Sequence, residues 1–404
     1  ANYVLRLRKT ILKTPTPTSV PINYLLTESI FLRNEPEDAR LNFTEIARKY
    51  GRKAKEYDVV TEDGYILKIF RVYPVREAPK MLPMLLVHGI GDSADSFIIR
   101  GNISLAITLT REGYDVWAGN IRGIKYGRRH RVLNPDRDIE FWNYSVHENG
   151  YYDVAAQIDY VLDATGHKKV NIIAHSQGNT ACFVLASTRP EYNEKINLLT
   201  ALAPVAFLHN LKPALSYLVN STWFLNNLFL TLGQEELPDR LSRTALKLVC
   251  DSRLGYDFCV NGVFFGFGGS DTAEFESEFL PIVSGHYPQT TSRKSLLHLG
   301  QIALSKRFAH FDYGKRNLQI YNSVTAPDYN LSDVKTNVAL IYGVNDKFTP
   351  LRNVAKLRKR LPNVVEYTMI QRRNWNHLDF LWARHLGKYL YPYLLPVLKK
   401  YSEV

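Results

Sequence analysis

The chain alternates between short, continuous apolar runs and longer stretches in which apolar residues recur every three or four positions. The first pattern is typical of strands buried on both faces of a parallel sheet, and the second of helices with one buried face. Ahead of these runs, "YDVVTEDGYILKIFRVYP" (57–74) predicts a β-hairpin that turns at Glu62-Asp63-Gly64. The apolar runs are "MLPMLLVHG" (81–89), "GYDVWAGNIRG" (113–123), "KKVNIIAHS" (168–176), "INLLTALAPVAF" (196–207), "TNVALIYGVND" (336–346) and "NVVEYTMI" (363–370).

Helices are predicted between the apolar runs. Residues 152–165 present one apolar face and end at Gly166, a typical helix stop. Residues 178–188 are predicted as the next helix, which ends before Pro190, and residues 351–360 as a basic helix. This alternation of strand and helix indicates an α/β fold with a mainly parallel sheet and helices on both faces.

The alternation stops between residues 208 and 309, which read as helical or irregular and rich in aromatic side chains. We therefore expect an inserted subdomain at 208–309, with the α/β core formed by residues 56–207 and 310–404. Residues 1–55 are polar and basic, and we expect them to form an N-terminal extension laid over this core.

A candidate nucleophile lies in "AHSQG" (174–178), between a predicted strand and a predicted helix. Serine hydrolases have the pattern G-x-S-x-G at this turn, because the strand and the helix pass too closely for larger residues. Gly178 satisfies this requirement, and Ala174 departs from it by one methyl group. An ordinary structural serine is the alternative, but the strand–turn–helix context favours Ser176 as a nucleophile.

A nucleophilic serine needs a base, and the base needs a carboxylate that orients it. In this architecture the chain order is serine, acid, histidine, with each residue at or just beyond the end of a strand. Asp346 follows the strand in "VALIYGVND", and His377 follows the strand "NVVEYTMI". Asp379 is a rival acid, but it follows no strand end. We therefore predict a Ser176–His377–Asp346 triad.

The predicted reaction also needs two backbone N–H groups that stabilise a developing oxyanion. We expect one from Gln177, at the start of a helix, and one from Ile90, in the loop after "LLVHG". The same loop fits G-x-G-x-x-A from Gly89 to Ala94, a dinucleotide-binding pattern, but a hairpin precedes it and Asp115 lies inside its strand. We therefore expect no organic cofactor.

The composition excludes some classes of binding partner and of cellular location. The net charge of +12 is spread along the chain without a basic, aromatic-interleaved stripe, so we expect no nucleic-acid partner, although attraction to anionic lipid is possible. Polar residues interrupt the most apolar stretch, 217–232, which falls short of the roughly 18 apolar residues of a membrane span. We expect a soluble protein without a transmembrane segment.

Sequons and cysteines point to the secretory route. Because the chain begins at Ala1 without methionine or a signal peptide, we interpret it as a mature form. Cys250 and Cys259 are close enough in sequence for a short disulfide loop, Cys182 is expected to be a buried free thiol, and no cysteine has the partners of a metal site. Five N-x-S/T sequons predict glycosylation at Asn42, Asn102, Asn143, Asn220 and Asn330.

From about Tyr57 to its C-terminus the chain resembles the acid lipase family of α/β-hydrolases, which includes gastric lipase, lysosomal acid lipase and insect relatives. The similar segments include "YDVVTEDGYIL", "LLVHGIGDSADSF", "GNIRG", "FWNYSVHENGYYDVAAQIDYVLDATG", "AHSQG", "HFDYGKRNLQIYN", "PDYNLSDV", "GVNDKFTP" and "NHLDFLWA". The resemblance implies an α/β-hydrolase fold with a cap over 208–309 and a movable lid near 228–262. It places the family's triad on Ser176, Asp346 and His377 and its oxyanion donors on Ile90 and Gln177.

The nine-residue spacing of Cys250 and Cys259 is that of the family's cap disulfide. The chain departs from the family at Ala174, at Phe97, where tryptophan is usual, and at Lys347-Phe348 after the acid. The expected function is hydrolysis of neutral lipid esters (triacylglycerols, with sterol esters as a further possibility) at a lipid–water interface, by a secreted or lysosomal glycoprotein. The alternatives are a short-chain carboxylesterase and an inactive lipid-binding protein on the same scaffold.

Overall fold

An eight-stranded sheet forms the centre of the computed structural model, which describes residues 35–76, 81–252 and 255–402. The strands lie in the order β1-β2-β4-β3-β5-β6-β9-β10. β1 pairs antiparallel with β2, and β2 with β4, whereas the other pairings are parallel. The predicted hairpin and mainly parallel sheet are therefore confirmed. The strands are β1 (Ala54–Val60), β2 (Ile66–Val72), β3 (Met84–Val87), β4 (Val116–Ala118), β5 (Val170–His175), β6 (Ile196–Leu202), β9 (Asn337–Tyr342) and β10 (Val364–Met369).

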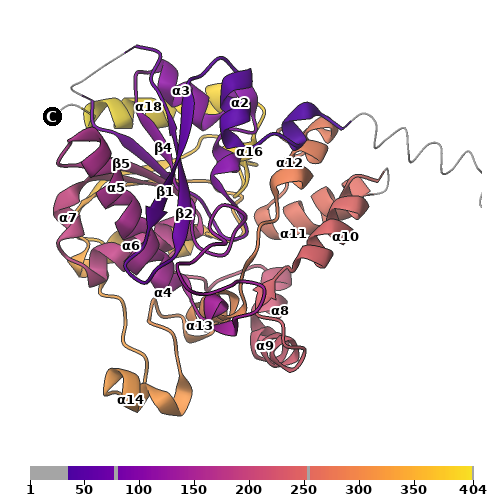
Figure 1. Ribbon diagram of the computed structural model, residues 1–404, viewed down its shortest axis with the longest axis vertical. Helices are drawn as coiled ribbons and strands as arrows, with labels where there is room; N and C mark the ends of the chain where they lie inside the picture. The colour runs from indigo at the N-terminus through magenta and orange to yellow at the C-terminus, as the bar shows by residue number, and fades with distance from the viewer. Residues whose placement is uncertain (1–34, 77–80, 253–254, 403–404) are drawn as a thin grey trace, which may run out of the picture. The chain divides into compact units, whose positions relative to one another are not determined.

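Helices cover both faces of this sheet, because successive strand residues point to opposite sides (Figure 1). Ile69 and Phe70, neighbours in β2, are both fully buried but belong to different hydrophobic cores. The core around Phe70 includes residues of α2 (Phe43–Lys49), α3 (Leu105–Arg111), α16 (Asp379–Trp382), α17 (Leu386–Tyr389) and α18 (Tyr391–Lys400). The core around Ile69 includes residues of α5 (Ala155–Thr165), α6 (Gln177–Thr188), α7 (Tyr192–Lys195) and α15 (Leu351–Arg360).

The predicted helices occur where the sequence placed them, with one difference in local geometry. The helix expected at 152–165 ends at Gly166 as predicted, with a left-handed φ of 71°, but it begins earlier, with the π-helical segment Asn149–Val154 before α5. The short α4 (Val146–Glu148) precedes this segment. Wider turns of this kind are frequent at functional sites, and this one lies against α6.

The segment between β6 and β9, which contains the predicted insertion, is mainly helical, and Figure 1 shows its helices gathered beside the sheet. Two features were not anticipated: a small antiparallel pair, β7 (Glu236–Leu237) with β8 (Thr291–Ser292), and the outlying α14 (Asn317–Tyr321). Cys250 and Cys259 form a disulfide, and Cys182 is a buried free thiol. The helices are α8 (Pro213–Asn220), α9 (Thr222–Thr231), α10 (Arg240–Cys250), the π-helical Asp257–Phe264, α11 (Phe265–Gly268), α12 (Leu280–His286) and α13 (Arg293–Ser305).

The end of the predicted N-terminal extension packs into the core. Residues 37–404 form one compact unit, so the extension predicted at 1–55 includes a part that belongs to the main fold, while residues 1–34 lie outside the described residues. Asn42 caps α2 through a capping box with Glu45. Phe43 is fully buried and stacks on Phe70 with 4.8 Å between ring centroids.

Four of the five predicted glycosylation sites have exposed asparagines, at positions 102, 143, 220 and 330. Asn42 is only partly exposed, and its side-chain oxygen accepts hydrogen bonds from the Glu45 N–H and the Thr44 hydroxyl. Across the described ranges, no helix combines the length and the apolar character that crossing a membrane requires.

Phe43→Ala should lower the free energy of unfolding by about 3–5 kcal/mol, because it removes a fully buried ring and leaves a cavity against Phe70. Urea denaturation followed by tryptophan fluorescence measures the loss. Val132→Ala is the control, since Val132 is 82% exposed and should change stability little. Equal stability of the two variants would show that the buried Phe43 ring does not stabilise the fold.

Candidate active site

Ser176 occupies a strained turn between β5 and α6. Its φ of 55° and ψ of −123° lie where residues other than glycine are rarely found. Strain of this kind is a recurring feature of nucleophile turns, where it exposes the serine hydroxyl above the sheet. The turn is also tight: a Cβ on Gly178 would lie 2.5 Å from the Val87 carbonyl oxygen, and one on Gly89 would lie 3.0 Å from Ser176 Cβ.

The structure brings the three predicted triad residues together. Ser176 Oγ lies 2.8 Å from His377 Nε2, and His377 Nδ1 lies 2.8 Å from Asp346 Oδ2. Ser176 follows β5, Asp346 follows β9 and His377 follows β10, so the carboxyl ends of parallel strands deliver all three side chains to one edge of the sheet.

Asp346 is held as a carboxylate. Burial alone would raise the pKa of Asp346, but the adjacent His377 and the hydrogen bonds from Thr349 hold that pKa below its ordinary value. Thr349 donates from its N–H to Oδ1 at 2.8 Å and from its hydroxyl to Oδ2 at 2.6 Å. The rival acid, Asp379, instead accepts from the Asn376 N–H at 2.8 Å, and burial raises its pKa well above the usual range. The geometry therefore pairs His377 with Asp346.

Two further contacts of His377, with His175 and Phe348, were not predicted from the sequence. His175 Nε2–H donates to the His377 carbonyl at 2.9 Å, and its ring lies 5.0 Å from the His377 ring. Burial lowers the pKa of His175 to about 3, so this ring is neutral. The ring centroids of Phe348 and His377 lie 4.8 Å apart. His175 is next to Ser176 in the sequence and Phe348 is two residues after Asp346. Position in the sequence alone did not indicate that either ring would contact His377.

The two predicted oxyanion donors lie at the same place. Ile90 and Gln177 line one cavity together with Ser176. Within the described part of the chain, neither backbone N–H donates to another protein group. Gln177 is the first residue of the 12-residue helix α6, whose amino end favours negative charge. Both residues therefore border the space beside Ser176, and their N–H groups have no acceptor among the described protein groups.

A cavity of about 460 Å³ adjoins Ser176 and His377. Its wall is predominantly apolar, and much of it comes from α8, α9 and α13, so ligand atoms beside Ser176 would meet hydrocarbon. The apolar lining residues are Ile90, Val205, Leu208, Leu211, Leu215, Leu218, Val219, Leu225, Phe229, Leu237, Leu296, Leu297, Leu299, Phe348, Leu378, Leu381 and Trp382.

The segment between β6 and β9 also contacts the loops that carry the site. The Gly268 carbonyl accepts from the N–H groups of His377, at 3.2 Å, and Lys347, at 3.4 Å. Lys347 Nζ donates to the carbonyl of Phe265 in α11 at 2.7 Å. The Gln289 N–H donates to the Gly91 carbonyl, directly after Ile90, at 2.6 Å. This segment therefore braces the site as well as covering it.

The loop that matches the dinucleotide pattern, residues 89–94, contributes to the wall of this cavity. Gly89, Ile90 and Asp92 line the cavity over Ser176, and Asp115 is engaged in a two-pronged ion pair with Arg71, both contacts at 2.8 Å. Among the residues that the structure describes, no three His, Cys, Asp or Glu side chains gather as they would around a metal ion.

Comparison with protein families places this chain among known hydrolases. Residues 83–383 match the family described as alpha/beta hydrolase fold, and residues 43–101 match the partial alpha/beta-hydrolase lipase region. The second match begins within α2, upstream of the Tyr57 limit inferred from the sequence. Since the first match spans well over half of the chain, the fold is confirmed.

Curated relatives cover most of the chain. It is 36% identical to Lipase 1 of Drosophila melanogaster over 92% of this chain and 82% of that protein. It is 33% identical to gastric triacylglycerol lipase of Rattus norvegicus (88% and 90%) and 32% identical to Lipase member K of Homo sapiens (92% and 94%). Among solved structures, a thermophilic esterase from Thermogutta terrifontis superposes with a TM-score of 0.50 at 12% identity, over 86% of this chain and 99% of that one, which supports the fold alone.

Substitution on the two sides of Ser176 should have unequal effects. Gly178→Ala should abolish most activity or folding, because its Cβ would collide with the backbone carbonyls of Val87 and His88. Ala174→Gly should change kcat by less than tenfold, since the methyl group is already packed in the core. Ester hydrolysis per folded molecule checks both. A tenfold or larger gain from Ala174→Gly (about 1.4 kcal/mol) would show that this methyl strains the turn.

Asp92 should make stability depend on pH. Burial raises the pKa of Asp92 from 3.8 to about 7, so the folded protein binds this proton more tightly than the unfolded chain does. The stability that Asp92 contributes is therefore fully present below pH 3.8 and is lost as the pH rises through about 7. Relative to Asp92→Asn, the wild type should lose up to about 4 kcal/mol of unfolding free energy between pH 4 and pH 8. Urea denaturation at several pH values measures this difference. If the unfolding free energies of the two proteins change with pH in parallel, the raised pKa of Asp92 is contradicted.

Proposed function

This chain belongs to the acid lipase family of α/β-hydrolases and is a carboxylic ester hydrolase, and we propose that it is a serine lipase acting on neutral lipid esters such as triacylglycerols. The observation that carries the proposal is the continuous contact from Asp346 through His377 to Ser176 beside a largely apolar cavity. The names of the lipase relatives agree with this substrate class.

In the proposed acylation step, Ser176 Oγ attacks the ester carbonyl carbon while His377 Nε2 takes the hydroxyl proton. Asp346 accepts the His377 Nδ1–H and stabilises the imidazolium that forms. The carbonyl oxygen becomes an oxyanion and accepts hydrogen bonds from the N–H groups of Ile90 and Gln177, each worth about 3–4 kcal/mol in the transition state. His377 then returns the proton to the departing alcohol, which leaves an acyl group on Ser176.

Deacylation repeats these roles with water as the nucleophile. His377 takes a proton from the water, which attacks the acyl carbon on Ser176, and the same two N–H groups stabilise the second oxyanion. Collapse of this intermediate returns the proton from His377 to Ser176 Oγ and releases the fatty acid. The proposed cycle uses only residues of this chain and one water molecule.

The surface beside the cavity supports a lipid–water interface as the place of action. In α9, Leu225 and Phe229 line the cavity, whereas Trp223, Phe224 and Leu228 are exposed on the same helix. An apolar patch open to solvent marks a surface that contacts another apolar phase. Other large apolar residues exposed on α8–α10 and the π-helical segment are Tyr217, Leu218, Leu230, Leu241, Leu248, Val249 and Phe258. Lid movement near 228–262 stays a prediction.

We place the protein in the secretory route, outside the cell, with the lysosome as the alternative. The disulfide between Cys250 and Cys259 suits an oxidising compartment, and the exposed sequon asparagines are accessible to glycosylation. Treatment with an N-glycosidase should lower the apparent mass of protein made in animal cells.

Hydrolysis of tributyrin, triolein and cholesteryl oleate from pH 4 to 9 tests the proposed function. Wild type should release fatty acid from triolein, and Ser176→Ala should lose a factor of about 10⁴ or more, because no other group replaces the attacking hydroxyl. Ser187→Ala, on the same helix α6, is the matched control and should retain activity. Turnover of tributyrin alone would indicate a short-chain esterase, and no turnover by folded wild type would indicate a binding protein.

A further inference from the structure

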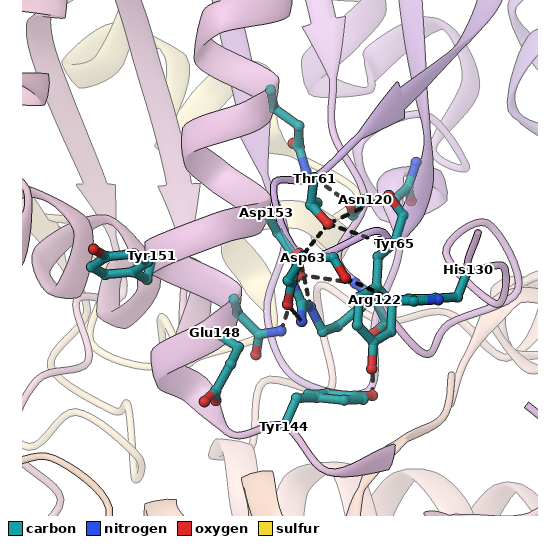
Figure 2. Close-up of polar contacts among 12 residues, drawn as sticks. Thr61, Asp63, Tyr65, Asn120, Arg122, His130, Tyr144, Glu148, Tyr151 and Asp153 are labelled. Atoms are coloured by element: carbon teal, nitrogen blue, oxygen red, sulfur yellow. Dashed lines mark hydrogen bonds and ion pairs between the residues drawn. The ribbon is translucent and has the colours of Figure 1, made fainter. Parts of the chain in front are cut away.

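A buried ionic network is linked by hydrogen bonds to the loops that carry the proposed oxyanion donors. Its centre is Arg122, only 1% exposed, which lies between two carboxylates (Figure 2). The guanidinium donates to Asp63 at 2.6 and 2.9 Å and to Asp153 at 2.7 and 2.9 Å, and it lies 3.9 Å from the Tyr65 ring. Burial alone would lower the pKa of Arg122, but the two carboxylates raise it, so the guanidinium stays protonated.

Such a buried charge is a poor source of stability. Desolvating an arginine and two carboxylates costs several kcal/mol per ion, and an apolar replacement of similar shape is often as stable. Asp153 is also fully committed as an acceptor: besides the guanidinium, it accepts from the Arg122 N–H at 3.0 Å and from Asn149 Nδ2 at 3.2 Å. The network therefore fixes the positions of the backbone at 122 and of the π-helical segment at 149–154.

One arm of the network leads to Ile90. Beside Arg122, the Ile121 N–H donates to His88 Nε2 at 3.2 Å, which leaves the ring proton on Nδ1. That Nδ1–H donates to the Gly89 carbonyl at 2.8 Å. Burial lowers the pKa of His88 to about 4, in keeping with a neutral ring. Because the Gly89 carbonyl and the Ile90 N–H belong to one planar peptide unit, this hydrogen bond fixes the direction of the Ile90 donor.

The second arm leads to Gln177. Asn149, whose Nδ2 donates to Asp153, accepts a hydrogen bond on its Oδ1 from Gln177 Nε2 at 3.3 Å. Asn149 and Gln177 are 1% and 3% exposed, so water does not compete for these contacts. Gln177 begins α6, and its N–H is the second proposed donor. The side-chain contact therefore ties the first turn of α6 to the same carboxylate that orients Arg122.

We propose that Arg122 and Asp153 are positioning residues that align both halves of the oxyanion hole, through His88 on one side and Asn149 on the other. Neither residue touches substrate. Their effect is to hold two N–H groups, from loops that follow different strands, at the spacing a single oxyanion requires. This inference rests on the proposed function, because only an oxyanion-forming reaction makes use of that alignment.

The test compares the transition-state analogue with the substrate. Asn149→Ala, Asp153→Asn and Arg122→Lys are assayed for kcat and KM with p-nitrophenyl butyrate, and for Ki with an alkyl trifluoromethyl ketone, whose adduct with Ser176 places an oxyanion in the hole. Asp115→Asn is the matched control, because Asp115 forms a comparable two-pronged ion pair with Arg71, which the described contacts do not connect to the oxyanion donors. Rates are expressed per titrated active site, and thermal unfolding is recorded for every variant.

Asn149→Ala should lower kcat about tenfold and raise Ki by the same factor, with KM changed less than about twofold, because alignment matters only when the oxyanion forms. Asp153→Asn and Arg122→Lys should change kcat and Ki by larger factors, again equal for the two quantities. The control, Asp115→Asn, should change neither. A purely structural network would instead lower the unfolding temperature and leave kcat and Ki unchanged, which would overturn the proposal.

If Arg122→Lys does not fold, Asn149→Ala decides, because it removes one arm and leaves the ion pair intact. A wild-type protein that neither hydrolyses the ester nor binds the ketone would contradict the proposed function itself. That result is distinct from unchanged Ki values in the variants, which would contradict only the positioning role.

Discussion

The close passage of the β5–α6 turn over the end of β3 is the constraint on which the rest of the site depends. Gly178 has no room for a side chain against the Val87 carbonyl, and a Cβ on Gly89 would lie only 3.0 Å from Ser176 Cβ. This proximity places the proposed nucleophile directly beside the loop that carries Ile90. The parallel strands β9 and β10 then bring Asp346 and His377 to the same edge of the sheet. Backbone geometry, more than any single side chain, creates the arrangement.

The segment between β6 and β9 both covers the cavity and supports the loops that carry the site. Its helices supply much of the apolar wall of the cavity. Among its hydrogen bonds to the reactive loops, one joins Gly268 to His377 and another joins Gln289 to Gly91. A movement large enough to admit a lipid must therefore either spare these two contacts or disturb the site. Because both contacts lie outside 228–262, the segment expected to move as a lid, opening and alignment can remain separate events.

The features that depend on local pattern could be predicted from the sequence. Continuous apolar runs identified the buried strands, and the order of the strand ends was enough to group Ser176, Asp346 and His377. Contacts between distant residues could not be predicted in this way. The polar, basic composition of residues 1–55 concealed that Phe43 fills the core, and no spacing rule joins Arg122 to Asp63 and Asp153, or Gln177 to Asn149. Such partners are set by the packing of whole elements.

The proposed function requires Ser176 to be the nucleophile of an ester hydrolase. The most direct measurement is mass spectrometry of peptides from protein treated with an alkyl phosphonate ester, which modifies an activated serine as its leaving group departs. We predict one modified residue, Ser176, and loss of the modification when His377 is replaced by alanine. Modification of a different serine, or none in folded wild-type protein, would contradict it.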